Sequence, residues 1–167
     1  MGAGKTSVGE ALAGRLGWHF HDVDRVVEME MGRPIVEIFR DVGEATFRAR
    51  EADVAARVLE EDHVVLSVGG GWGAVPGQLT SVPRGTATVW LEVSPEEAVR
   101  RAATEPGQRP LLQVKDPTAE ARSLLNQRAA GYAGARWRVD TERSSVEDVT
   151  ARIMDILSAH PMKIRTE

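Results

Sequence analysis

The first residues of the chain match the second half of a known phosphate-binding motif. In the Walker A pattern, G-x-x-x-x-G-K-[ST], the backbone N–H groups of a glycine-rich loop surround phosphate oxygens at the amino end of a helix. The matching residues are Gly2, Ala3, Gly4, Lys5 and Thr6, with Ser7 directly after them. Lys5 would contact the β- and γ-phosphates of a nucleotide, and the Thr6 hydroxyl would bind Mg²⁺. The alternative is a glycine-rich start of an ordinary helix.

The leading glycine of this motif would fall two residues before Met1, and the strand that normally feeds the loop does not precede it. We therefore expect that an upstream segment of about ten residues encodes an apolar strand and its glycine. On this interpretation Met1 is an interior residue. We also expect that a chain starting at Met1 is unstable or inactive, because a central strand contributes two rows of ladder hydrogen bonds.

Composition favours one globular domain, residues 1–167, and excludes several functions. The net charge is −4, without a basic block, so a nucleic-acid-binding role is not expected. The chain has no cysteine, which excludes disulfides and thiolate metal sites. It also shows no apolar run that could span a bilayer and no signal peptide, so we expect a cytoplasmic protein without membrane contact.

Strand and helix patterns alternate along the sequence, which predicts an α/β fold with a doubly wound parallel sheet and helices on both faces. Four strands are expected, within residues 18–24, 64–68, 86–93 and 137–140. Helices are expected at residues 6–16, before the stop signal Gly17, and from about Val26 to the stop signal Gly32. Further helices are expected at 34–39, at 44–60, starting at Ser94, around 124–128 and at 146–159.

Two aspartates follow the first expected strand. Asp22 and Asp24 are two residues apart at the carboxyl end of that strand, where open α/β sheets bind ligands. One carboxylate can hold metal-bound water while the other accepts a proton from a hydroxyl group. The alternative is a solvated turn in which Asp22 caps the next helix.

Arginines and glycines later in the chain are further candidates. Arg48 could clamp a substrate carboxylate with two parallel hydrogen bonds, with Glu51 holding it in place, although a local i, i+3 ion pair is the simpler explanation. Residues 69–71 are three successive glycines, which suit either a tight bend or a ligand lying against bare backbone. Arg109 could close over phosphates as part of a lid, and Arg128 could hold a carboxylate. For each of them the alternative is an ordinary arginine that faces solvent.

The order of these motifs resembles the shikimate kinase family over essentially the whole chain. The matching series is Gly-Ala-Gly-Lys-Thr, Asp-Val-Asp, Gly-Glu-x-x-Phe-Arg-x-x-Glu, Gly-Gly-Gly, Arg-Pro-Leu-Leu and Arg-x-x-x-Tyr. The resemblance implies transfer of the γ-phosphoryl group of ATP to the 3-hydroxyl of shikimate, giving shikimate 3-phosphate and ADP on the route to chorismate and aromatic amino acids. It also implies Mg²⁺ as cofactor, a monomer, a five-stranded phosphate-loop kinase fold and a mobile lid at about residues 107–120.

The resemblance also implies roles for individual residues. Lys5 would act on the phosphates, Thr6 and Asp22 would hold the metal, and Asp24 would bind substrate hydroxyls and act as base. The substrate carboxylate and ring would contact Arg48, Arg128, Gly70 and Gly71. The lid arginine would be Arg109, a catalytic group that reaches ATP, and the adenine-side contacts would come from Arg101 and Arg143.

The chain departs from the family pattern after the three glycines, where residues 72–76 read Trp-Gly-Ala-Val-Pro, and in a slightly longer stretch between Arg101 and Arg109. Two other functions remain open from the sequence. One is a small-metabolite kinase resembling gluconate kinase. The other is a non-catalytic, degenerate nucleotide-binding protein.

Overall fold

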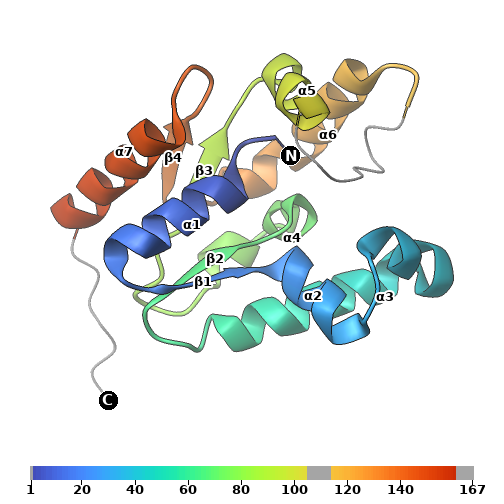
Figure 1. The fold of residues 1–167 in the computed structure, drawn as a ribbon, viewed down its shortest axis with the longest axis horizontal. Coiled ribbons are helices and arrows are strands. Elements are labelled where there is room, and N and C mark those ends of the chain that lie inside the picture. The colour runs from blue at the N-terminus through green and yellow to red at the C-terminus, as the bar shows by residue number, and fades with distance from the viewer. Residues whose placement is uncertain (1, 105–113, 161–167) are drawn as a thin grey trace.

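The computed structural model describes residues 2–104 and 114–160. Its four strands are β1 (His19–Asp22), β2 (Val64–Ser67), β3 (Val89–Glu92) and β4 (Trp137–Asp140). The α-helices are α1 (Lys5–Leu16), α2 (Val23–Met31), α3 (Ile35–Val58), α4 (Gly70–Ala74), α5 (Pro95–Thr104), α6 (Pro117–Tyr132) and α7 (Val146–Ala159), with a 3₁₀ turn at Gln78–Thr80. Figure 1 shows this order along the chain. No helix in the described ranges is long and apolar enough to cross a membrane.

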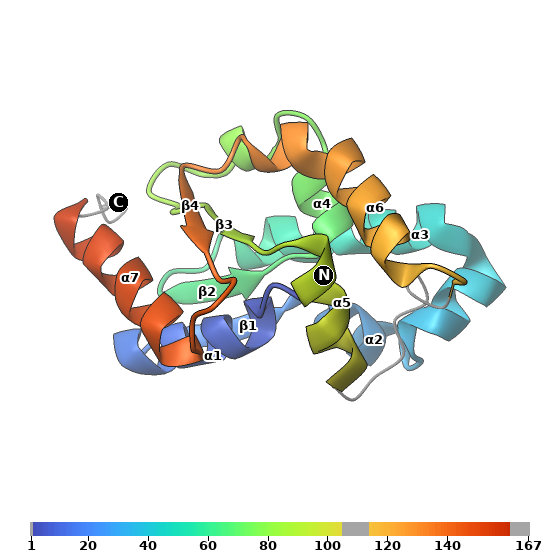
Figure 2. The ribbon, with the colours of Figure 1, turned by 90° about the horizontal axis from the view of Figure 1, so that it is seen from above.

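All four expected strands are present and parallel, but they form two pairs instead of one continuous sheet. β1 pairs with β2, and β3 pairs with β4. Within the described residues no ladder joins β2 to β3. The pairs are connected through side chains, because Val65 of β2 and Leu91 of β3 pack against the same apolar cluster of α1 and α7. Figure 2 shows α1 and α7 on one side of the strands and α4 and α6 on the other.

Helix α1 begins and ends at glycines with left-handed backbone conformations. Gly4 has a φ of 81°, and Gly17 has a φ of 68° with its N–H donating to the carbonyl of Ala13. Only glycine adopts this region readily, so both ends of the helix are fixed by the sequence. The buried side of α1 carries Val8 and Leu12, which pack in the cluster with α7.

A second apolar cluster lies around α2 and α3. Helix α3 contains a break at Gly43, with φ 83° and ψ 160°, so it consists of two helical parts as the sequence predicts. The aromatic rings of Phe39 and Phe47 meet edge to face across this break, with centroids 4.9 Å apart. The cluster therefore fixes the direction of the second part of α3, which carries Arg48 and Glu51.

Helix α4 was not expected, because glycine is a poor helix former. It begins at Gly70 and packs on α6, where Gly131 allows a very close approach: a Cβ atom at Gly131 would lie 2.2 Å from the Ala74 carbonyl oxygen. Tertiary packing between two helices thus overrides the local preference for a bend. This contact places the start of α4 beside the carboxyl ends of β1 and β2.

Candidate active site

Thr6 and Asp22 meet at the amino end of α1. The Thr6 hydroxyl donates to Asp22 Oδ2 at 2.7 Å, and Asp22 Oδ1 accepts from the Asp24 backbone N–H at 3.1 Å. Asp22 therefore caps α2, and its other oxygen lies against Thr6, the second residue expected to hold the metal. The helix cap that the sequence offered as the alternative to a metal role is thus present. It uses only Oδ1 of Asp22, so Oδ2 is left directed toward Thr6.

The residues at this point fit a magnesium site that depends on the nucleotide. Mg²⁺ is usually held by one or two carboxylates together with substrate phosphates and water. Thr6 and Asp22 supply one hydroxyl and one carboxylate within hydrogen-bonding distance of each other. In the described part of the chain, no group of three His, Asp or Glu side chains could hold a metal ion alone.

Asp24 lies two residues further on and is partly buried. Burial, followed by the negative charges of Asp22 and Glu51, raises the pKa of Asp24 to about 6. The cations Lys5 and Arg48 act in the opposite direction. A carboxylate with this pKa is mostly ionised near neutral pH and is still a better proton acceptor than an ordinary aspartate.

Arg48 is held between two glutamates of its own helix. Its Nη1 donates to Glu51 Oε2 at 2.8 Å, and its Nη2 donates to Glu44 Oε1 at 2.9 Å. The Glu51 side chain is 1 % exposed, while that of Arg48 is 32 % exposed. The buried carboxylate thus anchors a guanidinium whose outer side still reaches the open site. The second oxygen, Glu51 Oε1, is buried and has no hydrogen-bond partner.

The first of the three glycines faces this carboxylate group. A Cβ atom added to Gly69 would lie 2.0 Å from Glu51 Oε1 and 3.4 Å from Asp24 Oδ1. Only a residue without a side chain fits at Gly69. The missing side chain therefore leaves Glu51 and Asp24 next to bare backbone.

The other two glycines face the two expected carboxylate-binding arginines. A Cβ at Gly71 would lie 2.5 Å from the guanidinium carbon of Arg48, and one at Gly70 would lie 3.1 Å from Nη1 of Arg128. Arg48 comes from α3 and Arg128 from α6. Residues 69–71, which we call the glycine turn, thus bring together two cations that are far apart in the sequence. Guanidinium groups are well suited to binding a carboxylate.

Tyr132 is the tyrosine of the Arg-x-x-x-Tyr motif, and the sequence interpretation assigned it no role. Its hydroxyl donates to the Gly70 carbonyl at 2.9 Å, and burial raises the pKa of this phenol. It lies four residues after Arg128 on α6, so both side chains are on one face of the helix. That i, i+4 spacing was the available signal, but nothing in the sequence identified Gly70 as the partner.

A cavity of about 140 Å³ connects the phosphate loop to this glycine turn. Its lining includes Lys5, Gly70, Arg128 and Tyr132, together with apolar side chains of β3, α5 and α6. The loop lysine and Arg128, one of the two arginines expected to bind a carboxylate, therefore line the same space. A phosphate group and an acceptor molecule would meet there.

A second cavity, of about 400 Å³, lies on the other side of the phosphate loop. Gly4 and Ser7 of the loop line it, as do Arg101 of α5 and Arg143 of the turn between β4 and α7. The structure thus brings both expected adenine-side arginines to one cavity next to the loop. Arg109 lies outside the described residues, as does much of the expected lid at 107–120.

Comparison with known proteins gives one consistent family. A sequence model described as shikimate kinase matches residues 1–158. The shikimate kinase of Thermus thermophilus is 39 % identical over 160 residues, covering 96 % of this chain and 87 % of its own. That of Symbiobacterium thermophilum is 42 % identical over 159 residues, covering 94 % and 91 %.

Solved structures agree with these sequence matches. Shikimate kinase from Acinetobacter baumannii in complex with shikimate superimposes with a TM-score of 0.87 at 32 % identity, covering 98 % of this chain and 91 % of that one. Shikimate kinase from Bacteroides thetaiotaomicron gives a TM-score of 0.85 at 32 % identity, with coverage of 95 % and 94 %. The arrangement of parallel strands and helices described above is therefore the one found in these enzymes.

Proposed function

The chain belongs to the shikimate kinase family, an ATP-dependent phosphotransferase family of aromatic amino acid biosynthesis, and we propose that the residues described above carry out the transfer to the 3-hydroxyl of shikimate. The observation that carries this proposal is the glycine turn at residues 69–71. Arg48, Arg128 and Asp24 come from three different helices and all reach this turn.

Arg48 and Arg128 would bind the carboxylate of shikimate. Guanidinium groups form paired hydrogen bonds with a carboxylate, which fixes both the position and the orientation of the acceptor. Glu51 holds Arg48 from behind at 2.8 Å, and the bare backbone of Gly70 and Gly71 leaves room for the ring of the substrate.

Asp24 would accept the proton of the 3-hydroxyl group. Its raised pKa, about 6, suits a general base that works near neutral pH. As the hydroxyl oxygen attacks the γ-phosphorus of ATP and the bond to the β-phosphate oxygen breaks, the hydroxyl proton moves to an Asp24 oxygen. Positioning of the two reactants supplies much of the rate enhancement in reactions of this type.

The phosphates of ATP would lie at the amino end of α1, where backbone N–H groups and Lys5 favour negative charge. Thr6 and Asp22 would hold Mg²⁺, which supplies neutralisation of the charge on the β- and γ-phosphates. Arg109 would approach the phosphates from the lid side. The base of ATP would occupy the second cavity, next to Arg143. A monomeric state and a cytoplasmic location remain predictions.

A substrate panel with coupled detection of ADP tests this proposal. The purified chain is incubated with ATP and Mg²⁺ and with shikimate or gluconate, and far-UV circular dichroism verifies that the sample is folded. We expect ADP release with shikimate only. Turnover of gluconate without turnover of shikimate would overturn the acceptor assignment. A folded chain that binds ADP and phosphorylates neither compound would support the non-catalytic alternative.

A further inference from the structure

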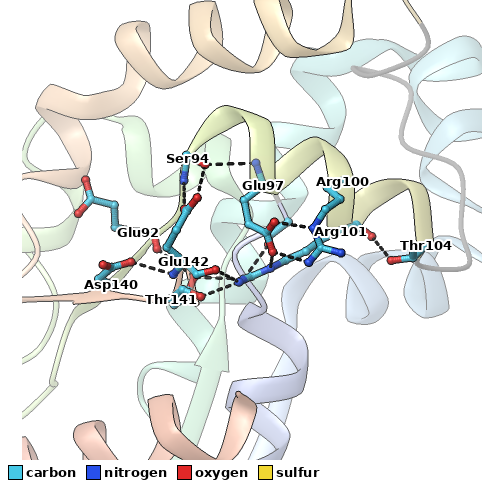
Figure 3. A network of polar contacts seen from close by, with 10 residues as sticks. Glu92, Ser94, Glu97, Arg100, Arg101, Thr104, Asp140, Thr141 and Glu142 are labelled. Carbon is cyan, nitrogen blue, oxygen red and sulfur yellow. Dashed lines mark hydrogen bonds and ion pairs between the residues drawn. The ribbon is translucent and has the colours of Figure 1, made fainter. Parts of the chain in front are cut away.

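Helix α5 and the turn between β4 and α7 are joined by a dense polar network (Figure 3). The turn covers residues 141–145, and we call it the β4–α7 turn. It contributes Glu142, Arg143 and Ser145 to the lining of the second cavity, next to Gly4 of the phosphate loop. The position of the turn therefore determines the shape of the cavity in which we place the nucleotide base.

Arg101 of α5 uses its whole guanidinium group in this network. Its Nη2 donates to the carbonyl oxygens of Thr141 at 2.5 Å and Glu142 at 3.2 Å. Its Nη1 donates to the Thr141 hydroxyl at 3.2 Å and, at 3.5 Å, to the carbonyl oxygen of Gly2. Its Nε donates to Glu97 at 2.7 Å. A guanidinium has five N–H groups, and here all five point at protein acceptors.

Because its donors are occupied, Arg101 has no N–H group left for a ligand in this arrangement. Its side chain is only 19 % exposed and is held by Glu97, which is 15 % exposed. Two of its acceptors are backbone carbonyl oxygens of the β4–α7 turn, so the guanidinium fixes the path of the turn. Lysine has one nitrogen at the end of a flexible chain and cannot reproduce the forked arrangement of two terminal nitrogens that donate to separate acceptors.

Glu142 fastens the same turn to the opposite end of α5. Its carboxylate accepts from the Ser94 backbone N–H at 2.8 Å and from the Ser94 hydroxyl at 2.6 Å, directly before the first residue of α5. Ser94 and Arg101 are seven residues apart, which corresponds to about 10 Å along a helix. The turn is therefore attached to α5 at two separate points. At one point a side chain of the turn, Glu142, accepts from Ser94, and at the other a side chain of α5, Arg101, donates to the turn.

We propose that Arg101 and Glu142 are positioning residues for ATP, which act by holding the β4–α7 turn as the wall of the nucleotide-base cavity. This inference rests on the proposed function, in which the base lies in the second cavity and the phosphates lie at α1. It predicts an effect on the binding of the base and none on the shikimate side. Gly70 and Arg128 line the other cavity, Arg48 lies against Gly71, and none of these four residues lines the second cavity.

Two substitutions test the attachment at its two ends. Arg101→Lys keeps the charge and removes the fork, and Glu142→Gln keeps the shape and removes the charge. For each variant we expect the KM for ATP to rise tenfold or more, with the KM for shikimate within twofold of the wild type and kcat little changed. A network that only stabilised the fold would lower the melting temperature without separating the two KM values.

Matched controls are available on the neighbouring strands. Arg138 and Glu92 form an ion pair between β4 and β3, with side chains 59 % and 30 % exposed, and neither side chain lines the second cavity. Arg138→Lys and Glu92→Gln make the same chemical changes a short distance away. We expect both controls to keep the wild-type KM for ATP.

Calorimetric binding of ADP and of inorganic tripolyphosphate provides a readout that does not depend on shikimate phosphorylation. Tripolyphosphate can occupy the phosphate loop but has no base. We expect Arg101→Lys and Glu142→Gln to weaken ADP binding tenfold or more. Glu142→Gln, which leaves the hydrogen bond between Arg101 and Gly2 of the phosphate loop in place, should weaken tripolyphosphate binding by less than twofold. Equal losses for both ligands, or no loss of ADP binding in either variant, would overturn the inference. If one variant fails to fold, the other still decides between these outcomes.

The same measurements separate this inference from the proposed function. A wild-type chain that does not phosphorylate shikimate, but whose ADP binding responds selectively to these two substitutions, would refute the function and support the positioning role. A wild-type chain that phosphorylates shikimate, but whose KM for ATP and KM for shikimate change equally in the two variants, would support the function and refute the positioning role.

Discussion

Replacing Asp24 by asparagine should make the protein more stable at neutral pH while removing its activity. In the folded chain, burial and then the charges of Asp22 and Glu51 raise the pKa of Asp24 from 3.8 to about 6. The ionised carboxylate is therefore less favourable in the folded state than in the unfolded state. Asparagine has nearly the same shape and carries no charge that must be desolvated.

The size of the effect follows from the pKa. A rise from 3.8 to about 6 corresponds to about 3 kcal/mol at 1.36 kcal/mol per pKa unit. The side chain is only partly buried, and solvent screening reduces this figure to about 2 kcal/mol. Asp24→Asn should accordingly unfold with a free energy about 2 kcal/mol larger than that of the wild type at pH 7.5.

The sign of the pH dependence is fixed by proton binding. Between about pH 4 and pH 6 the folded wild type holds a proton on Asp24 that the unfolded chain releases, so the wild type gains stability as the pH falls through this window. The advantage of Asp24→Asn should therefore shrink to about half at pH 5.0 and vanish near pH 4. The phosphorylation rate of the wild type should fall below about pH 6, because the base becomes protonated.

Urea unfolding followed by circular dichroism at pH 7.5 and pH 5.0 measures both differences. Asp53→Asn is a suitable control, because Asp53 lies on α3 with a side chain that is 71 % exposed. Its effect should stay within about 0.5 kcal/mol at both pH values. If Asp24→Asn is less stable than the wild type at pH 7.5, or if its advantage does not decrease at pH 5.0, the reasoning is wrong. The same variant should lose about 10²- to 10⁴-fold in phosphorylation rate.

Two further predictions concern the glycine turn. Gly71→Ala places a Cβ 2.5 Å from the Arg48 guanidinium and should raise the KM for shikimate about tenfold in steady-state assays. Gly14→Ala is the control, because a Cβ there would have nothing within 4 Å. It should raise the unfolding free energy by about 0.5–1 kcal/mol. An unchanged KM for Gly71→Ala would contradict the close approach. Tyr132→Phe keeps the ring but loses the 2.9 Å hydrogen bond to the Gly70 carbonyl, and should lower the unfolding free energy by about 1 kcal/mol in urea titrations.

Much of the local structure could be predicted from the sequence because its signals act over a few residues. Gly17 and Gly32 end their helices in the left-handed conformation, with φ 68° and 64°. Ser94 caps α5 through the Glu97 N–H, and a reciprocal capping box opens α7 at Ser145. Each of these features is determined by neighbouring residues, so a single sequence is sufficient to identify it.

Contacts between distant segments could not be predicted in the same way. Tyr132 and Gly70 are 62 residues apart, and Arg101 and Thr141 are 40 residues apart. Such pairs depend on how helices pack on the strands. The sequence placed Arg101 near the adenine by resemblance, but only the structure shows that its five N–H groups bind the protein itself.

The features that are least favourable for folding occur at one place in the molecule. A helix that begins within three glycines, a buried Glu51 oxygen without a partner and a desolvated Asp24 all meet at Gly69. Each of them lowers the stability of the chain by itself, and packing elsewhere must offset all three. The placement of Asp24 and Arg48 at this point has a simple explanation if an acceptor with hydroxyl and carboxylate groups binds there, because such a ligand supplies a proton for Asp24 and a counterion for Arg48.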